Sequence, residues 1–253
     1  MADGLIHENY LAALERVTVL GPGGETQRLG PWLLLDAGLD FDYYNIAALA
    51  RPAAAGASSA SAIQQAIGWF DVREKPFRLI LRDPADRPLI EAAFAAGFQV
   101  EDREPAMLLE SLDGVSPAPG ALRISHLAND EEADVYAAIE PEESGDLAVR
   151  RAISRGALRI AGCSLFVGRE GTRAVASSMG LVTGRMVGVY NVFVQPAARG
   201  LGYGEAMTAA VLHEGRAHGA TAACLTSTAV GVSLYQRMGF RTRYHYVSLW
   251  RPG

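Results

Sequence analysis

The sequence predicts an α/β fold in which a central mixed sheet is flanked by helices. The stretch 187–204 supports this fold, because an apolar run ends in a glycine-rich turn that leads into a helical segment. Apolar runs of strand length also alternate with segments of helical period along most of the chain. Finally, 79–98 resembles 225–240 at an offset of 142, and 44–46 resembles 190–192 at 146, so the first half is predicted to be a diverged copy of the second.

The first half is predicted from its periodicity and its turn residues. We expect a helix at 5–19, a turn at 21–24, strands at 31–36 and 43–50, a loop at 53–62, a helix at 62–72, a strand at 77–81, a helix at 86–96 and one or two strands at 98–110. Two prolines and two glycines within 114–120 indicate a linker. The predicted domains are therefore 1–113 and 121–253.

The second half is predicted by the same signals. We expect a strand at 122–125, helices at 130–139 and 147–154, strands at 158–168, 174–183 and 187–194, a helix at 205–218, a strand at 221–226, a helix at 228–238 and a final strand at 241–250. Acidic residues open the helix at 130, where they favour the helix dipole. Gly219 and Gly239 end two of the helices.

The turn that follows the strand at 187–194 has the chemistry of an anion-binding site. The first amides of a helix have no partner within it, and the helix dipole places partial positive charge there. Glycines allow the backbone to approach a ligand closely, and Arg199 adds a charged fork. The turn is therefore predicted to cradle a phosphate, although a plain tight turn has the same residue types.

The glycine spacing separates the known phosphate-binding loops. A P-loop requires a lysine after its last glycine, and a dinucleotide fold requires Gly-x-Gly-x-x-Gly; 199–204 matches neither pattern. This stretch instead resembles the Arg-x-x-Gly-x-Gly loop of the GNAT superfamily of N-acetyltransferases. The stretch 233–240 resembles the Leu-Tyr…Gly-Phe helix end of the same family. The resemblance covers about 121–251 and implies two tandem GNAT-like domains.

The resemblance implies acetyl-CoA as the cofactor and assigns residues to it. The implied contacts are a main-chain pairing of pantetheine with Phe193 and Val194, and a pyrophosphate site at Arg199, Gly200, Leu201, Gly202, Tyr203 and Gly204. An amide of the strand at 192–194 is implied to polarise the thioester carbonyl. Tyr235 is implied to be the catalytic acid that protonates the thiolate, and Ser227 either touches the pantetheine arm or only caps the next helix.

The N-terminal half departs from the family at both chemical positions. No glycine loop follows Arg51 and Pro52, and Ala93 stands where the repeat places Tyr235. The copy is therefore predicted to be degenerate and to shape or cover the acceptor site, or to pack against the catalytic half.

The general base is left open by the sequence. The strand at 187–194 carries no acid, only the polar residues Tyr190 and Asn191. An acidic cluster lies near the first helices of the second half and would attract a cationic amine, although a solvated loop has the same composition. The remaining candidates are two histidines or a chain of water molecules. The candidate side chains are Glu140, Glu142, Glu143, Asp146, His126 and His245.

Composition excludes several other classes of protein. A net charge of −5 argues against a dedicated nucleic-acid binder, and no apolar run reaches the length of a membrane span. Cys163 and Cys224 have no Cys or His partner at metal spacing, so no metal site is expected and both are interpreted as buried free thiols in a reducing compartment. The N-terminus has no signal pattern, which makes the cytoplasm the default location.

Together these observations predict an acetyl-CoA-dependent N-acetyltransferase that acts on a primary amine of a small molecule or a peptide. The alternative is a non-catalytic coenzyme A or acyl-CoA binding or regulatory module, which the missing base keeps open. An acyl group other than acetyl is also compatible with the sequence, as is a homodimer. Acceptor identity depends on loop shape and is not predicted.

Overall fold

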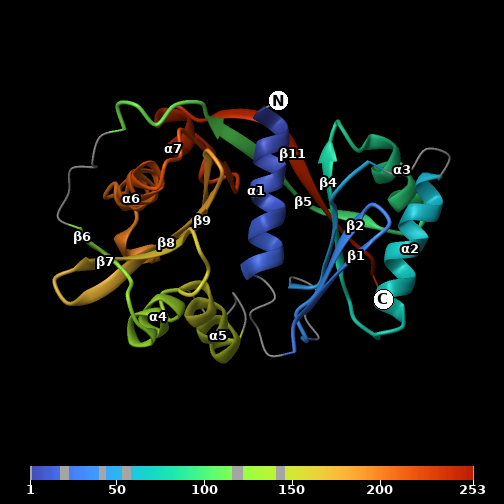
Figure 1. The fold of residues 1–253 in the computed structure, drawn as a ribbon, viewed down its shortest axis with the longest axis horizontal. Helices are drawn as coiled ribbons and strands as arrows, with labels where there is room; N and C mark the ends of the chain where they lie inside the picture. Colours follow the sequence, from blue (N-terminus) through green and yellow to red (C-terminus); the bar gives the residue numbers. More distant parts are fainter. Residues whose placement is uncertain are drawn as a thin grey trace.

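The protein is described by a computed structural model that covers residues 2–17, 23–39, 44–52, 58–115, 122–140 and 146–252. Its described strands form one sheet of eleven strands in the order β1-β2-β3-β4-β11-β5-β10-β9-β8-β7-β6. Helices lie on both faces of this sheet (Figure 1). The predicted α/β class, with a mixed central sheet flanked by helices, is confirmed.

The N-terminal half contributes one end of the sheet. Its elements are α1 (Ala2–Val17), β1 (Glu25–Leu29), β2 (Trp32–Asp36), β3 (Ile46–Leu49), α2 (Ser59–Asp71), β4 (Arg78–Asp83), α3 (Arg87–Ala95) and β5 (Gln99–Leu109). β1 to β3 form antiparallel pairs, whereas β3 and β4 run parallel. β2 and β3 are buried along their whole length, as expected for apolar strands covered on both faces.

The C-terminal half contributes the other end. Its elements are β6 (Arg123–His126), α4 (Asp130–Ala137), α5 (Leu147–Ala157), β7 (Cys163–Glu170), β8 (Arg173–Thr183), β9 (Met186–Val194), the short 3₁₀ turn Pro196–Ala198, α6 (Tyr203–Ala217), β10 (Ala222–Thr226), α7 (Val232–Arg237) and β11 (Arg241–Trp250). β6 to β9 form antiparallel pairs, and β9 and β10 run parallel. This repeats the parallel pair of β3 and β4 in the first half.

The two halves exchange their last strands. β11, from the end of the chain, pairs with β4 on one side and with β5 on the other. β5, from the first half, pairs with β10 of the second half. Figure 1 shows the consequence, since the C-terminus lies beside α2 of the first half. The sheet is therefore continuous across the predicted boundary, and the division at 114–120, of which 116–120 lie outside the described residues, stays a prediction.

The helices divide between the two faces of the sheet. α2 and α3 pack on Leu79, Leu81 and the alternate residues of their neighbouring strands, and α6 and α7 pack on the same face farther along. α1 packs on the other face, on the cluster that contains Ile80, Leu108 and Tyr246. α1 also contacts α5, so it bridges the two halves at the centre of the molecule (Figure 1).

Buried polar contacts attach α1 to both halves. The Asn9 side chain is fully buried and donates to the Leu181 carbonyl (3.0 Å) and to the Thr183 hydroxyl (2.7 Å) of β8. His7 Nε2 donates to the Leu49 carbonyl at 2.7 Å, so Nδ1 is the nitrogen that accepts from the Tyr246 hydroxyl at 3.0 Å. Burial and the nearby Arg82 lower the pKa of His7 to about 4.

The structure confirms the internal repeat at the ends of α3 and α7. The Phe98 amide donates to the Ala93 carbonyl at 3.0 Å, and the Phe240 amide donates to the Tyr235 carbonyl at 2.9 Å. The glycine before each phenylalanine has a positive φ, 88° at Gly97 and 93° at Gly239, as this helix ending requires. Ala93 thus occupies the place of Tyr235, as the offset of 142 predicts.

Several boundaries differ from the predictions. β1 was not predicted, because its sequence Glu-Thr-Gln-Arg-Leu is almost wholly exposed at the edge of the sheet and has no apolar alternation. The expected strand at 158–168 begins only at Cys163, since α5 extends to Ala157. The expected loop at 53–62 contains the first turn of α2, which Ser58 caps. Of the two cysteines expected to be buried, Cys224 is buried and Cys163 is partly exposed.

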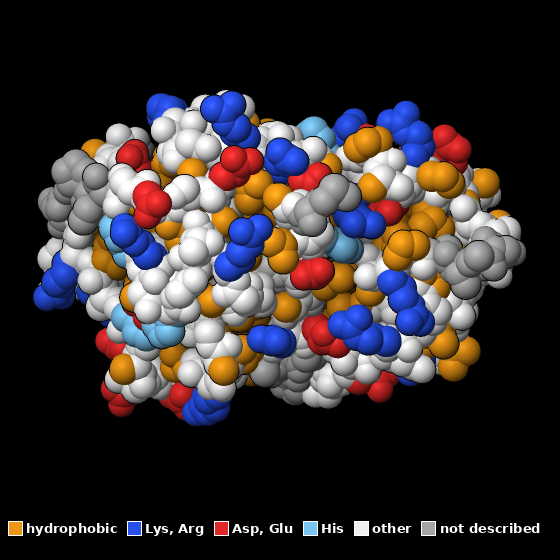
Figure 2. All heavy atoms as spheres, turned by 45° about the horizontal axis from the view of Figure 1, so that its top comes forward, with side chains coloured by type: hydrophobic (Ala, Val, Ile, Leu, Met, Phe, Trp, Pro, Cys, Tyr) orange, Lys and Arg blue, Asp and Glu red, His pale blue; other side chains and the backbone are white. Residues whose placement is uncertain are grey.

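The surface carries acidic and basic side chains in close alternation. Figure 2 shows them interspersed over the upper face of the molecule rather than gathered by sign. Many are ion-paired, as Arg82 is with the buried carboxylate of Asp86 at 2.9 Å. Among the described residues, no helix has the length and apolar character needed to cross a bilayer.

Candidate active site

The glycine turn predicted from the sequence forms an uncapped helix N-terminus. Gly202 is the N-cap of α6, with a φ of 78° and no side-chain hydrogen bond to the first amides. Gly200 also has a positive φ, 80°. A Cβ built at Gly200 or Gly202 meets no atom within 4 Å, so open space lies in front of the turn. The turn therefore offers free amides, the positive end of the helix dipole and open space, which together suit the binding of a phosphate group.

The side chains around this turn hold its backbone in place. Arg199 Nε donates to the Val194 carbonyl at 3.1 Å, which ties the turn to the end of β9. The Tyr203 hydroxyl donates to Glu170 Oε1 at 2.6 Å, which ties the start of α6 to the end of β7. The Tyr203 side chain thereby has a structural contact, and its amide is the first amide of α6.

Tyr235 of α7 is connected to the glycine turn by the side chain of one threonine, Thr208. Thr208 donates to the Gly204 carbonyl at 2.8 Å and hydrogen-bonds the Tyr235 side chain. A Cβ at Gly204 would lie 3.1 Å from Leu234, so the turn and α7 are in direct contact. Burial raises the pKa of Tyr235, and the bond with Thr208 opposes part of this rise, so the phenol is protonated at neutral pH.

Ser227 is not the helix cap that was one of its two interpretations. α7 begins at Val232 with Gly231 as its N-cap, because 228–231 form a turn closed by the Gly231 amide and the Thr228 carbonyl at 3.0 Å. The Ser227 amide still donates to the Pro105 carbonyl of β5 at 3.2 Å. Its hydroxyl donates to the Thr228 carbonyl at 2.8 Å, and the residue is 1% exposed.

β9 and β10 diverge next to this cluster. Their parallel pairing runs from Met186 with Ala222 to Val189 with Leu225, and β9 then continues to Val194 against β8 alone. A β-bulge lies at the divergence, opposite Ser177 and Met179, and Asn191 there has a φ of 49°. The β10-facing edge of 190–194 is therefore a strand edge to which an extended ligand arm can add.

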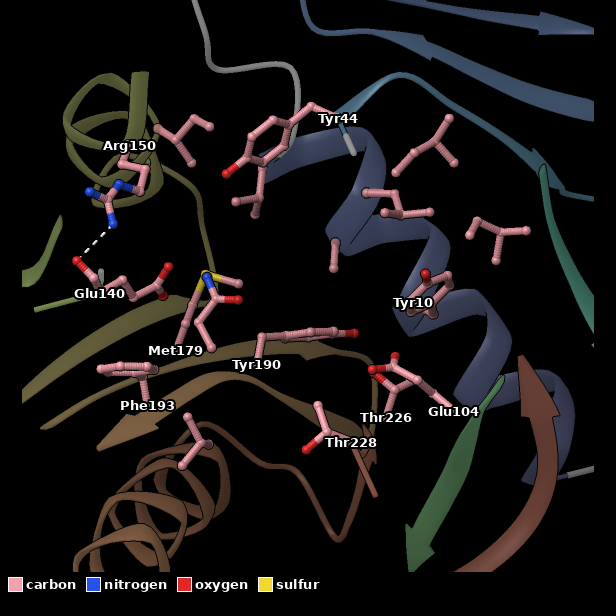
Figure 3. Close-up of a pocket in the computed structure, with 18 of the residues that line it drawn as sticks. Tyr10, Tyr44, Glu104, Glu140, Arg150, Met179, Tyr190, Phe193, Thr226 and Thr228 are labelled. Atoms are coloured by element: carbon pink, nitrogen blue, oxygen red, sulfur yellow. Dashed lines mark hydrogen bonds between the residues drawn. The ribbon is translucent and has the colours of Figure 1, made fainter. Parts of the chain in front are cut away.

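A cavity of about 680 Å³ opens at this divergence on the α1 face of the sheet (Figure 3). Both halves line it: α1, β4, β5 and β11 meet α4, α5 and the diverging ends of β9 and β10 there. Its polar and aromatic lining includes Tyr10, Tyr44, Arg78, Asp102, Glu104, Tyr136, Glu140, Arg150, Tyr190, Asn191, Phe193, Thr226, Thr228 and Tyr246. Of the predicted cofactor residues only Phe193 lines it, while the glycine turn, Ser227 and Tyr235 lie on the α6 face.

Titratable groups in the cavity are perturbed by their burial. Desolvation raises the pKa of Glu104, the neighbouring Asp102 adds to this rise, and a hydrogen bond from Thr226 opposes it. Desolvation likewise raises the pKa of Glu140, which Arg150 opposes. The Tyr136 hydroxyl is buried on the wall, and its pKa is raised well above its ordinary value by desolvation. Carboxylates with raised pKa values in a cavity are candidates for proton transfer.

The structure separates the base candidates that the sequence left open. Tyr190, Asn191 and Glu140 line the cavity, whereas Glu142 and Glu143 lie outside the described residues. Asp146 instead caps α5, accepting from two amides of its first turn.

Neither histidine candidate lines the cavity. His126 packs against Phe166 on the edge strand, and His245 alternates with the cavity-lining Tyr246, so it faces the opposite side of the sheet.

Glu104 is a residue that sequence reasoning missed. It lies in the first half, which the missing glycine loop marks as degenerate, and no local motif surrounds it. Only the pairing of β5 with β10 brings it to the divergence of β9 and β10, because the register places Ala106 opposite Thr226 and Glu104 just beyond the end of β10.

Comparison with known proteins identifies the family to which the chain belongs. The family model described as probable histone acetyltransferase Rv0428c, C-terminal, matches residues 11–248 of the chain. The chain belongs to this acetyltransferase family of the GNAT superfamily. No curated protein sequence matches it.

Solved structures share the GNAT fold over nearly the whole chain. A GCN5-related N-acetyltransferase from Kribbella flavida has a TM-score of 0.75 at 22% identity, over 99% of this chain and 95% of that one. A tandem GNAT protein from the clavulanic acid biosynthesis pathway has a TM-score of 0.67 at 15% identity, over 99% and 95%. A GCN5-related N-acetyltransferase from Sphaerobacter thermophilus has a TM-score of 0.63 at 17% identity, over 90% and 83%. The tandem GNAT organisation is thereby supported, and the fold is one that supports acyl-CoA-dependent acetyl transfer.

The described residues of the N-terminal GNAT-like half contain no counterpart of the glycine turn, and 53–57 lie outside them. After β3, the amides of Ala50 and Arg51 both donate to the Pro31 carbonyl, at 2.8 and 3.2 Å. The N-terminus of α2 is capped by the Ser58 hydroxyl, which accepts from the Ser61 amide at 3.1 Å. The first amides of α6 have no side-chain cap and can donate to a phosphate, whereas the Ser61 amide of α2 already donates to Ser58.

Proposed function

We propose that the protein transfers an acetyl group from acetyl-CoA to a primary amine of a small molecule or a peptide. The observation that carries the proposal is the divergence of β9 from β10, with an uncapped glycine turn on one face and an aromatic, carboxylate-bearing cavity on the other. This arrangement separates an anionic cofactor from an amine and lets the two meet at one gap in the sheet.

The proposed cofactor site uses backbone groups for most of its contacts. The amides of 200–204 face the pyrophosphate at the positive end of α6, and Arg199 adds charge beside them. Phe193 and Val194 pair with the pantetheine arm along the open edge of β9, and Ser227 lies beside Tyr235 at the end of β10. Bound acetyl-CoA supplies an acetyl thioester, and an amide within 192–194 polarises its carbonyl.

Tyr235 is proposed as the acid that protonates the departing thiolate. Its pKa is raised by burial, so it keeps its proton until a group of similar basicity develops nearby. Thr208 connects the phenol to the glycine turn, because it hydrogen-bonds the Tyr235 side chain and donates to the Gly204 carbonyl. The proton donor is thus held by the same turn that binds the cofactor.

The cavity is proposed as the acceptor site. Its carboxylates attract a cationic amine, and its tyrosine and phenylalanine rings favour an ammonium group over their faces. The family description names histones, so a lysine-bearing basic peptide belongs in the acceptor panel beside small amines. The proposed acceptors therefore include both small amines and lysine-bearing peptides.

The test is calorimetry with acetyl-CoA followed by an acceptor screen scored by free thiol release. Hydrolysis without an acceptor is subtracted from every rate. Binding of acetyl-CoA with acceptor-dependent thiol release and an acetylated product detected by mass supports the proposal. Binding without any turnover above hydrolysis favours the alternative, a coenzyme A binding or regulatory module.

A further inference from the structure

We propose that Glu104, supplied by the N-terminal half, is the general base that deprotonates the acceptor amine in the catalytic half. This inference rests on the proposed acetyl transfer and names the residue that the sequence did not reveal. The exchanged strand β5 carries it to the site, so the degenerate half has a catalytic role although it has no glycine turn of its own.

The position of Glu104 follows from two strand registers. On one side Ala106 lies opposite Thr226, the last residue of β10, so Glu104 stands just past that strand. On the other side Glu104 lies opposite Tyr246 of β11. Its carboxylate lines the cavity together with Tyr190, Asn191 and Phe193 of the diverging β9. Figure 3 shows it beside Thr226, on the same side of the cavity as Tyr10 and Tyr190.

No other acid lies so near the divergence among the described residues of the two strands concerned. β9 reads Met-Val-Gly-Val-Tyr-Asn-Val-Phe-Val and β10 reads Ala-Ala-Cys-Leu-Thr, neither with a carboxylate. The other acids of the cavity lining are Asp102, one step farther from β10 on the same face of β5, and Glu140, beyond α4. Glu104 is therefore the carboxylate that borders the gap itself.

Burial and the neighbouring groups together determine the affinity of Glu104 for a proton. Burial raises its pKa, and Asp102 on its own strand raises it further. From β4, Arg78 and Arg82 line the same face of the sheet, but each is ion-paired, with Glu101 at 2.7 Å and Asp86 at 2.9 Å. The other facing titratable groups are the phenols of Tyr10, Tyr190 and Tyr246, with Thr226 donating a hydrogen bond. A carboxylate with a raised pKa accepts a proton more readily near neutral pH.

In the proposed reaction, Glu104 and Tyr235 are the two residues that transfer protons. Glu104 takes one proton from the ammonium and later releases it to water. The free amine nitrogen attacks the thioester carbon, so a C–N bond forms and the C–S bond breaks. Tyr235 gives its proton to the departing sulfur and recovers one from the nitrogen, directly or through water, so one proton is released per acetyl group transferred.

The experiment compares Glu104→Gln with wild type in calorimetry and in kcat/KM measured from pH 5 to 10. We expect unchanged affinity for acetyl-CoA and a loss of about 10²- to 10⁴-fold in kcat at pH 7. The loss should shrink as the pH approaches the pKa of the amine, because the free amine then forms without a base. Glu104→Asp should recover part of the activity. Glu110→Gln, the same change at the residue that follows β5 and outside the cavity lining, should leave the rate unchanged.

Asp102→Asn provides an independent readout that a merely structural Glu104 would not move. Since Asp102 raises the pKa of Glu104, its removal should shift the acidic limb of kcat/KM to lower pH. This shift decides the matter if Glu104→Gln does not fold. Wild-type kcat in folded Glu104→Gln, or a rise in amine KM with kcat unchanged at every pH, overturns the base role while acetyl transfer stands. Failure of wild type to acetylate any amine overturns the proposed function itself, and Glu104 then has no amine to deprotonate.

Discussion

Replacing Tyr235 by phenylalanine is the sharpest test of the proposed acid. The change removes one hydroxyl and keeps the ring, which packs edge-on against Phe240 at a centroid distance of 5.9 Å. Thr208 keeps its bond to the Gly204 carbonyl, so no buried donor is left without a partner. We therefore expect a stability loss of only about 1 kcal/mol, the net worth of one hydrogen bond.

The expected loss of activity is much larger than that. Removing one general acid costs about 10²- to 10⁴-fold in general, and a loss of about 10- to several-hundred-fold is expected here. The loss should appear equally in kcat and kcat/KM, since the proton is transferred only in the transition state. Calorimetric affinity for acetyl-CoA should persist. A thioester with a less basic thiol should narrow the difference between variant and wild type.

A matched variant separates this effect from the loss of any buried hydroxyl. Tyr244→Phe removes a phenol that is equally buried, 8% exposed like Tyr235, and that hydrogen-bonds Tyr246 at 3.0 Å outside the proposed cofactor site. Denaturant unfolding and steady-state thiol release measure both variants. If Tyr235→Phe keeps wild-type kcat, or if Tyr244→Phe loses as much, Tyr235 is a packing residue and the acid role is refuted.

Three further predictions follow from the same contacts. Gly202→Glu should abolish measurable acetyl-CoA binding, whereas Gly184→Glu, which also replaces an open glycine of positive φ but in the turn between β8 and β9, should bind normally; equal binding by both sinks the phosphate site. Calorimetric titration should give one acetyl-CoA per chain, since the α2 N-terminus is capped by Ser58, and a ratio of two contradicts the degenerate half. The lowered pKa of His7, about 4 against 6.5, favours the folded state above pH 6.5, so about 3 kcal/mol should be lost as pH falls from 6.5 to 4. Urea unfolding across that range should show this loss in wild type and not in His7→Gln, and parallel curves would contradict it.

Local sequence was enough to predict the glycine turn and the helix end that form the proposed cofactor site. The glycine turn and the Tyr235 helix each span fewer than ten residues, and their conformations depend on φ values and hydrogen bonds within the segment. The offset of 142 likewise predicted that Ala93 replaces Tyr235. Most strands were predicted for the same reason. The exposed polar strand β1 was not, because its residues lack apolar alternation and it is a strand through its pairing with β2.

By itself, then, the sequence determined the class of fold, the tandem repeat and the glycine turn at 199–204 that leads into α6. Only the tertiary structure decided where β5 and β11 pair, because strand partners far apart in the chain are chosen by the registers and packing of the whole sheet. That choice moves Glu104 from a half without a cofactor turn to the end of β10, and it closes the cavity with α1 and both halves. The proposed acceptor site is therefore a property of the assembled sheet, and no single segment of the chain contains it.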